Sequence, residues 1–241
     1  MTARELYQAG KLDAAIQALV AELRDNPDDV RGRTFLFELL CFAGEYDRAA
    51  KHLNVLAAAS PDAATGALVY GAALSAETTR RELFSKGEFP ASPAAGPVSG
   101  TLNGRPFESI EDADPRIGAR LEIFAAGDYM WLPLMHVSSV RMEAPKRLRD
   151  LLWTPAWIKT GPSFNGKELG EVLIPALAPF SSRHADDAVR LGRATVWEEQ
   201  ENGGVPYGQK TLLVDGEDFP LLEVRSLEIS VEQPQTNASA Q

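Results

Sequence analysis

The chain has 241 residues, and its 24 Lys and Arg against 34 Asp and Glu give a formal net charge of −10. An acidic chain lacks the basic face that non-specific binding to nucleic acid or to an anionic membrane requires, so we expect neither partner. An apolar content of 44% is ordinary for a folded protein and too high for a disordered one.

The single cysteine, Cys41, cannot form an intramolecular disulfide, so nothing in the sequence requires an oxidising compartment. The opening residues MTARELYQAGKLDAA lack the continuous apolar segment of a secretory signal. No run reaches the roughly 18 apolar residues that a membrane helix needs. We therefore expect a cytoplasmic protein.

Residues 1–86 have the apolar spacing of three and four that is typical of amphipathic helices, as in Leu12, Ile16 and Leu19. Glycine and proline divide this stretch into short segments. The pattern predicts helices at about 2–8, 11–24, 29–43, 46–58 and 63–84.

The helical half also contains an internal repeat. GKLDAAI at 10–16 aligns with GEYDRAA at 44–50, and NPD at 26–28 aligns with SPD at 60–62. The offset is 34 residues, which is the period of the tetratricopeptide repeat, a helix–turn–helix unit. About two and a half units are present, and such arrays bury their core only by stacking. The missing burial must come from the second half of the chain or from another chain.

From about residue 98 the pattern changes to the period of two that predicts strands. We expect a linker at 87–100, a mixed, strand-rich domain at 101–232 and a disordered tail at 233–241. Within the domain we expect a hairpin at 119–137, a second at 193–216, a strand at 227–232, and short helices near 145–152, 167–176 and 184–191. The predicted fold class is α+β, with tetratricopeptide-like helical hairpins (1–86) followed by the strand-rich domain.

Stacked repeats curve, and the first helices of successive units line the concave side. Counting positions from residue 30 predicts a partner-binding groove lined by Tyr7, Arg31, Thr34, Glu38, Phe42 and Leu68. A mixed apolar and charged groove suits an amphipathic or extended peptide. The alternative is that the linker or the second domain fills the groove, and the sequence leaves both open.

Other candidate sites are weaker. Cys41 lies near the end of a predicted helix, where the helix dipole disfavours a thiolate, so packing is the better interpretation. The loop GPSFNGKE at 161–168 resembles a phosphate loop but has Glu168 where Ser or Thr should bind Mg²⁺. The three histidines are far apart in the sequence and form no metal-binding motif. We therefore expect no catalytic residues, no metal and no cofactor.

Two further features of the second half have a structural interpretation. The four tryptophans, Trp131, Trp153, Trp157 and Trp197, are expected to anchor its core. The basic cluster APKRLRD at 144–150 could be a binding patch, although an ordinary solvated face is the favoured interpretation.

RTFLFELLCFAGEYDRAAKHLNVL at 33–56 and AGKLDAAIQALVAELRDNPDDVRGR at 9–33 resemble the ImpE/TagJ family, accessory proteins of bacterial type VI secretion systems. RLEIFAAGDYMWLPLMHVSSVRMEAPKRLRDLLWTPAWI and RLGRATVWEE, further along the chain, are similar to the same family. The resemblance covers nearly all of residues 1–232.

This resemblance implies a non-enzymatic role in the cytoplasm. It implies a partner, the small subunit of the contractile sheath, bound through a helix near that subunit's N-terminus. It also implies an effect on sheath assembly or on recycling by a ClpV-type AAA+ ATPase, which would be an indirect partner. The alternatives are a general peptide-binding assembly factor or chaperone and, less favoured, an enzyme with its site in the strand-rich domain.

Overall fold

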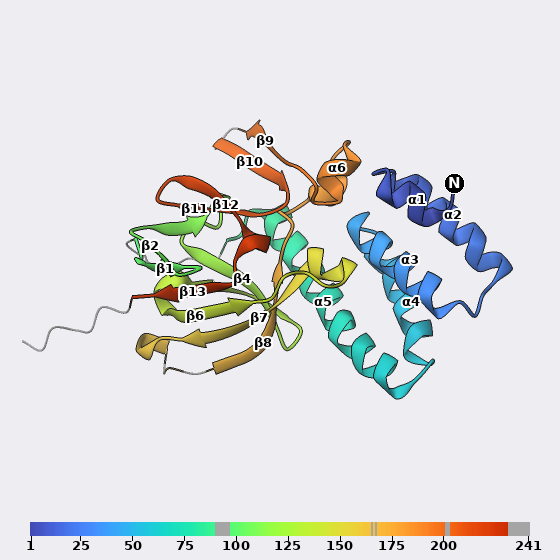
Figure 1. The fold of residues 1–241 in the computed structure, drawn as a ribbon, viewed down its shortest axis with the longest axis horizontal. Coiled ribbons are helices and arrows are strands. Elements are labelled where there is room, and N and C mark those ends of the chain that lie inside the picture. The colour runs from blue at the N-terminus through green and yellow to red at the C-terminus, as the bar shows by residue number, and fades with distance from the viewer. Residues whose placement is uncertain (90–96, 165, 167, 201–202, 231–241) are drawn as a thin grey trace, which may run out of the picture.

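The computed structural model describes residues 1–89, 97–164, 166, 168–200 and 203–230. A helical array at one end of the molecule leads into a body of strands at the other (Figure 1). The first five helices are α1 (Ala3–Gln8), α2 (Leu12–Asp25), α3 (Val30–Phe42), α4 (Tyr46–Ala57) and α5 (Pro61–Lys86). They agree with the five predicted helices to within two residues at every boundary, and the element order confirms the α+β class.

The two predicted corners between helices have the same geometry. Gly10 and Gly44 have φ values of +74° and +71°, in the left-handed region that favours glycine. At the first corner the N–H of Lys11 donates to Leu6 O over 2.9 Å, and at the second the N–H of Glu45 donates to Leu40 O over 2.9 Å. Both corners are therefore Schellman-type helix ends, one repeat apart.

The two corners differ in their surroundings, which gives a matched pair of substitutions. Gly10→Ala should lower the free energy of unfolding by about 1–2 kcal/mol, because alanine is strained at positive φ. Gly44→Ala should cost about 1 kcal/mol more, since its Cβ would lie 2.5 Å from Ser182 Oγ whereas the nearest atom to a Gly10 Cβ is 3.5 Å away. Urea unfolding of the two variants measures the difference, and equal losses would contradict the close contact at Gly44.

The strands begin after the helical array and include most of the chain from residue 100. They are β1 (Gly100–Leu102), β2 (Arg105–Phe107), β3 (Ile110–Asp112), β4 (Arg120–Ala125), β5 (Asp128–Pro133), β6 (Val137–Met142), β7 (Trp153–Thr160), β8 (Glu168–Pro175), β9 (Thr195–Gln200), β10 (Gly203–Gly208), β11 (Thr211–Val214), β12 (Glu217–Pro220) and β13 (Ser226–Ile229). Short helical turns connect them: η1 (Leu134–His136), η2 (Leu148–Leu151), η3 (Pro162–Phe164), η4 (Ser181–Arg183), α6 (Asp187–Arg190) and η5 (Leu221–Glu223).

Within the described residues, the large sheet has eight strands in the order β2-β1-β13-β6-β7-β8-β4-β5, and its pairs are antiparallel. A smaller sheet has the order β12-β11-β3, and β9 pairs with β10. The predicted hairpin at 119–137 is β4–β5, whose turn residues Ala126 and Gly127 both have positive φ. The region 193–216 is only in part a hairpin, because β11 leaves β10 and pairs with β12 and β3.

The helix predicted near 167–176 is wrong, because Glu168–Pro175 is the strand β8 between β7 and β4. The second half of this strand is buried, so its apolar residues form a continuous run. Such a run does not distinguish a buried strand from a buried helix. The other short helices are present only as η2 and α6. The tail at 233–241 and residues 90–96 of the predicted linker lie outside the described residues, and the division into separate domains stays a prediction.

The tryptophans do not all anchor the core. Trp153 is 2% exposed, whereas Trp157 on the same strand and Trp197 on β9 are each 45% exposed. Trp131 is partly buried and stacks on Phe89. Only Trp153 therefore has the fully buried position that was predicted for all four.

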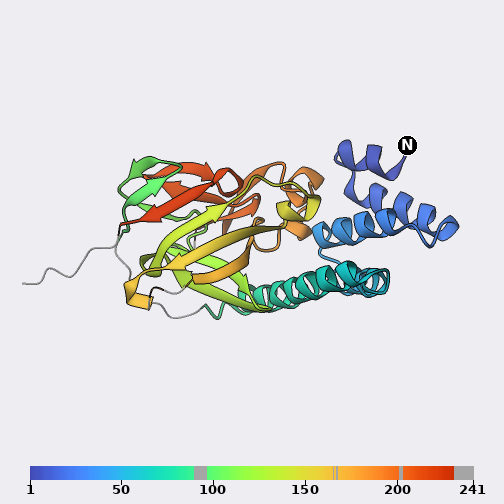
Figure 2. The same cartoon turned by 60° about the horizontal axis from the view of Figure 1, so that its bottom comes forward.

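The helical array shares its apolar core with the strand body. Phe124, Leu152, Trp153, Leu173 and Leu177 belong to the same buried cluster as the apolar residues of α1–α5. Trp153 stacks on Tyr70 of α5 with ring centroids 6.3 Å apart. Figure 2 shows α5 running from the array to the strands. The burial that two and a half repeats cannot supply by themselves thus comes from the second half of the same chain.

One segment of the strand body, residues 181–193, contacts both helix corners. At the first corner, Asp187 Oδ2 accepts the N–H of Leu12 over 2.8 Å, and Arg193 donates to Tyr7 O over 2.7 Å. At the second, Ser182 lies against Gly44. The C-terminal half of the chain therefore contacts two equivalent positions of the repeat.

A buried ion cluster joins α5 to the strands. Arg80 donates through Nε and one terminal nitrogen to the two carboxylate oxygens of Glu122, over 2.7 and 2.8 Å. Lys210 pairs with the same carboxylate and, over 2.5 Å, with Asp112. The Tyr129 hydroxyl donates to Glu122 over 2.6 Å. Arg80, Glu122, Lys210 and Asp112 are each no more than 4% exposed, so their charges are compensated by one another and not by water.

The two carboxylates of the cluster respond differently to burial. Burial alone would raise the pKa of Glu122, but the charges and hydrogen bonds of Arg80 and Lys210 outweigh it and lower the pKa to about 2. Burial raises the pKa of Asp112 to about 6, because the charge of Lys210 offsets only part of the desolvation and Glu122 adds repulsion. Glu122 is thus the carboxylate that holds the two buried cations.

Candidate partner-binding groove

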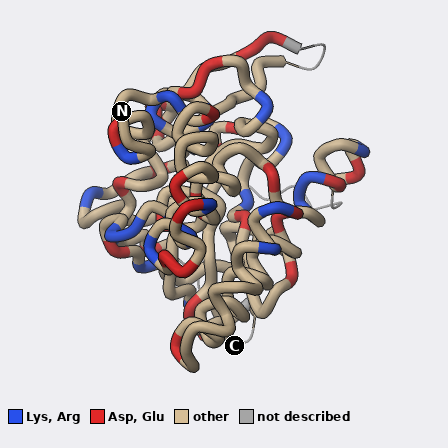
Figure 3. The backbone as a smooth tube through the Cα atoms, turned by 90° about the vertical axis from the view of Figure 1, so that its right-hand side faces the viewer, with Lys and Arg blue, Asp and Glu red and all other residues tan. Residues whose placement is uncertain are grey.

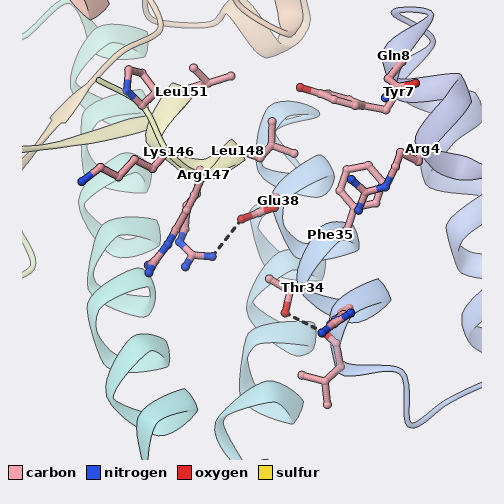
Figure 4. A pocket seen from close by; sticks show the side chains of 14 residues that line it. Arg4, Tyr7, Gln8, Thr34, Phe35, Glu38, Lys146, Arg147, Leu148 and Leu151 are labelled. Atoms are coloured by element: carbon pink, nitrogen blue, oxygen red, sulfur yellow. Dashed lines mark hydrogen bonds and ion pairs between the residues drawn. The ribbon is translucent and has the colours of Figure 1, made fainter. Parts of the chain in front are cut away.

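A groove of about 660 Å³ lies between the first helices of the two repeats and a segment of the strand body. One wall comes from α1 and α3 and the other from residues 145–151, which include η2 (Figure 4). The apolar lining includes Tyr7, Phe35, Leu148 and Leu151. The Tyr7 and Phe35 rings meet edge to face with centroids 5.6 Å apart. This surface offers an aromatic and aliphatic contact to a partner.

Basic side chains surround the apolar lining. Arg4 and Arg31 on the helices and Lys146 and Arg147 on the opposite wall are all exposed. The guanidinium of Arg4 lies 5.5 Å from the Phe35 ring centroid, where it covers one face of the ring. The groove therefore combines an apolar interior with a basic rim.

An ion pair crosses between the two walls. Arg149 donates to Glu38 Oε1 over 3.0 Å, and its guanidinium lies 4.8 Å from the ring centroid of Tyr70 on α5. Burial raises the pKa of Glu38, although the charge and hydrogen bond of Arg149 act in the opposite direction. The pair fixes the wall at 145–151 against α3 and therefore sets the width of the groove.

Four of the six predicted groove residues line this surface, namely Tyr7, Arg31, Thr34 and Glu38. Thr34 donates its hydroxyl to Val30 O over 2.8 Å, one turn earlier in α3. Arg31, Thr34 and Glu38 are three and four residues apart, which places them on one face of α3. Their role in binding a partner stays a prediction.

The predicted positions of Phe42 and Leu68 are wrong. Phe42 is 1% exposed, because the last turn of α3 is covered by the strand body and belongs to the shared core. Leu68 is 76% exposed but is not part of the groove lining. The wall at 145–151 lies opposite α1 and α3. Beside α5 lies the β4–β5 turn instead, since a Cβ built at Gly127 would be 3.4 Å from the Cβ of Ala72.

The second wall was not predicted to line the groove. For the basic cluster at 144–150, the sequence favours an ordinary solvated face over a binding patch. The signal available in the sequence was the combination of Lys146, Arg147 and Arg149 with Leu148 and Leu151, which is amphipathic over a short distance. Nothing local in that pattern identifies α3 as the surface opposite.

The other candidate sites have a structural explanation. Cys41 is 1% exposed, and burial raises the pKa of its thiol well above the usual range, with added repulsion from Glu38 and Glu77. Residues 162–164 of the supposed phosphate loop form η3, and Glu168 begins β8. Among the described residues there is no group of three or more His, Cys, Asp or Glu side chains placed to hold a metal ion. In the same residues, no helix combines the length and apolar character that crossing a membrane requires.

Corners that repeat at 34 residues, a core shared with a strand body and a groove between the two define a tetratricopeptide-type helical array packed on a strand-rich second half. In agreement, residues 6–69 match the tetratricopeptide repeat family, and residues 104–228 match the ImpE protein family. The chain belongs to the ImpE family.

One relative supports this assignment, and one solved structure shares the fold. The chain is 33% identical over 265 aligned residues to the type VI secretion system accessory component TagJ of Pseudomonas aeruginosa, with 95% of this chain and 91% of that protein covered. The crystal structure of protein VPA1032 from Vibrio parahaemolyticus superposes with a TM-score of 0.82 at 20% identity. It covers 95% of this chain and 97% of that chain, so the likeness extends over the fold of both halves.

Proposed function

We propose that this protein is a non-enzymatic accessory component of a bacterial type VI secretion system in the cytoplasm. Membership of the ImpE family and the 33% identity to TagJ support the secretion role. The groove between α3 and residues 145–151 supports an adaptor role, because a hollow of about 660 Å³ presents apolar and charged side chains together.

The proposed partner is the small subunit of the contractile sheath, bound through a helix near its N-terminus. The single observation that carries this proposal is the open groove over the first helices of the two repeats. An amphipathic helix would place its apolar face on Tyr7, Phe35 and Leu148, and Arg31 at the rim would fix its direction. Binding there would influence sheath assembly, or recycling of the sheath by a ClpV-type AAA+ ATPase.

A binding measurement with purified sheath small subunit tests the proposal. Tyr7→Ala should weaken binding about 30-fold, since aromatic anchors in an interface are worth about 2 kcal/mol or more. Arg31→Glu should also weaken it. Leu68→Ala is the matched control, because Leu68 is exposed on the same array but lies outside the groove. Phe42→Ala is not a useful probe, since it would remove a buried core side chain.

Circular dichroism and urea unfolding establish that each variant is folded. Unchanged binding by folded Tyr7→Ala and Arg31→Glu would move the partner site away from the groove. Weakening by Leu68→Ala alone would place the contact on the outer face of α5. If the wild type binds other amphipathic helices as tightly as the sheath subunit, the protein is instead a general peptide-binding assembly factor.

A further inference from the structure

The groove is lined mainly by basic residues, although the protein as a whole is acidic. The chain carries a formal net charge of −10, yet the groove lining contains five basic residues and one acidic residue, Glu38. The five are Arg4, Arg31, Lys146, Arg147 and Arg149. Basic and acidic segments are interspersed over this end of the molecule in Figure 3, so the imbalance belongs to the groove and not to a broad basic face.

Three of these cations have no acidic partner in the part of the chain that the structure describes. Glu38 pairs with Arg149, and Glu143 pairs with Lys146. Arg4, Arg31 and Arg147 form no ion pair with any carboxylate among the described residues. Unpaired like charges around one hollow repel each other, so a ligand that supplies negative charge relieves this repulsion on binding.

Arg149 provides a second, independent observation. Its contact with Glu38 uses a terminal nitrogen, whereas its Nε is buried and has no hydrogen-bond partner among the described residues. A buried donor without a partner is costly in a folded protein, and a carboxylate is the acceptor that best matches a guanidinium edge. Arg149, which is one of the lining residues, therefore has a guanidinium whose hydrogen bonding within the described residues is incomplete.

We propose that the segment held in the groove is acidic as well as amphipathic, with carboxylates beside its apolar stripe and one of them bound by Arg149. The inference rests on the proposed function, because it assigns the chemistry of the partner helix. Nucleic acid is also negatively charged, but the protein's net charge of −10 would repel its phosphate backbone. The apolar lining of Tyr7, Phe35 and Leu148 suits the apolar side chains of a helix instead.

The test uses three synthetic helical peptides with the same length and the same leucine stripe. Their polar positions are glutamate in the first, glutamine in the second and lysine in the third. Affinity is measured with the full chain by fluorescence anisotropy at about 50 and about 300 mM NaCl, a range over which exposed charges become screened. The glutamate peptide should bind about tenfold more tightly than the glutamine peptide at low salt, and the advantage should shrink at high salt.

Substitutions in the protein locate the effect. The double variant Arg31→Glu, Arg147→Glu should reverse the order of the glutamate and lysine peptides. Arg149→Lys keeps the charge but removes the guanidinium edge, so it should weaken the glutamate peptide more than the glutamine peptide. Arg105→Glu is the matched control, because Arg105 is an exposed arginine on β2, at the opposite end of the molecule from α1 and α3 (Figure 1).

The outcomes separate this inference from the proposed function. Three results would contradict an acidic partner. They are equal affinity for the three peptides, no binding of the glutamate peptide, and an order of affinities that is the same in the double variant as in the wild type. If the glutamate peptide binds in the groove but the sheath small subunit does not, the inference stands and the proposed sheath partner is wrong. If Tyr7→Ala weakens binding of the sheath subunit but the double charge variant does not, the groove binds the sheath subunit without a preference for an acidic segment.

Discussion

Glu122→Gln should lower the free energy of unfolding by about 3–5 kcal/mol, because it removes the carboxylate that two buried cations share, and leaves Arg80 with Glu77 alone and Lys210 with Asp112 alone. Here one carboxylate faces two buried cations, Arg80 and Lys210, and accepts the Tyr129 hydroxyl as well. A glutamine side chain of the same size keeps at most part of the hydrogen bonding and none of the charge. The measurement is urea unfolding followed by far-UV circular dichroism and by tryptophan fluorescence.

The two probes should shift together in this variant. Arg80 belongs to α5 of the helical array, whereas Glu122 belongs to β4 and Lys210 follows β10, so the cluster spans both parts of the chain. Glu228→Gln is the matched control, since Glu228 is exposed on β13 of the same sheet and should change stability by less than about 0.5 kcal/mol. A loss below about 1 kcal/mol for Glu122→Gln would show that the cluster does not hold the two parts together.

Trp153→Ala should cost about 3–5 kcal/mol, the usual loss for a large aromatic side chain in a core. Trp153 is 2% exposed, stacks on Tyr70 and donates its indole N–H to Glu77 over 3.3 Å. Its removal would leave a cavity between β7 and α5 and would leave a carboxylate oxygen of Glu77 without that donor. Thermal and urea unfolding both report the loss.

The same strand supplies the control for this prediction. Trp157 lies four residues further along β7 and is 45% exposed. Trp157→Ala should therefore cost less than about 1 kcal/mol. Equal losses at the two positions would contradict the assignment of Trp153 as the contact between the array and the sheet.

The helical array could be predicted closely because its signals are local. Gly10 and Gly44 mark positions where the backbone adopts positive φ, and only the chain within a few residues determines that requirement. The 34-residue spacing then fixes Ala15 and Ala49 at helix contacts, and both are fully buried. The fold class followed from the change of apolar period near residue 98.

The candidate site could be predicted only in part, because one of its walls comes from a distant part of the sequence. Arg149 meets Glu38 across 111 residues, and no local pattern encodes that contact. Position counting assumes an array that is free on its concave side, so it includes Phe42, which is buried in the shared core, and Leu68, which lies outside the groove lining. A similar limit applies to β8, whose second half is buried on both faces and so lacks the alternation that would identify a strand.

The double contact of residues 181–193 has a consequence for how such chains can vary. Helical arrays elsewhere change length by duplication of units, since each unit touches only its neighbours. Here Ser182 meets one corner while Asp187 and Arg193 meet the preceding one. An extra unit inserted between the corners would displace one of them by about 10 Å, the spacing of packed helices. A unit duplicated between the two corners would therefore break one of these contacts with the second half of the protein.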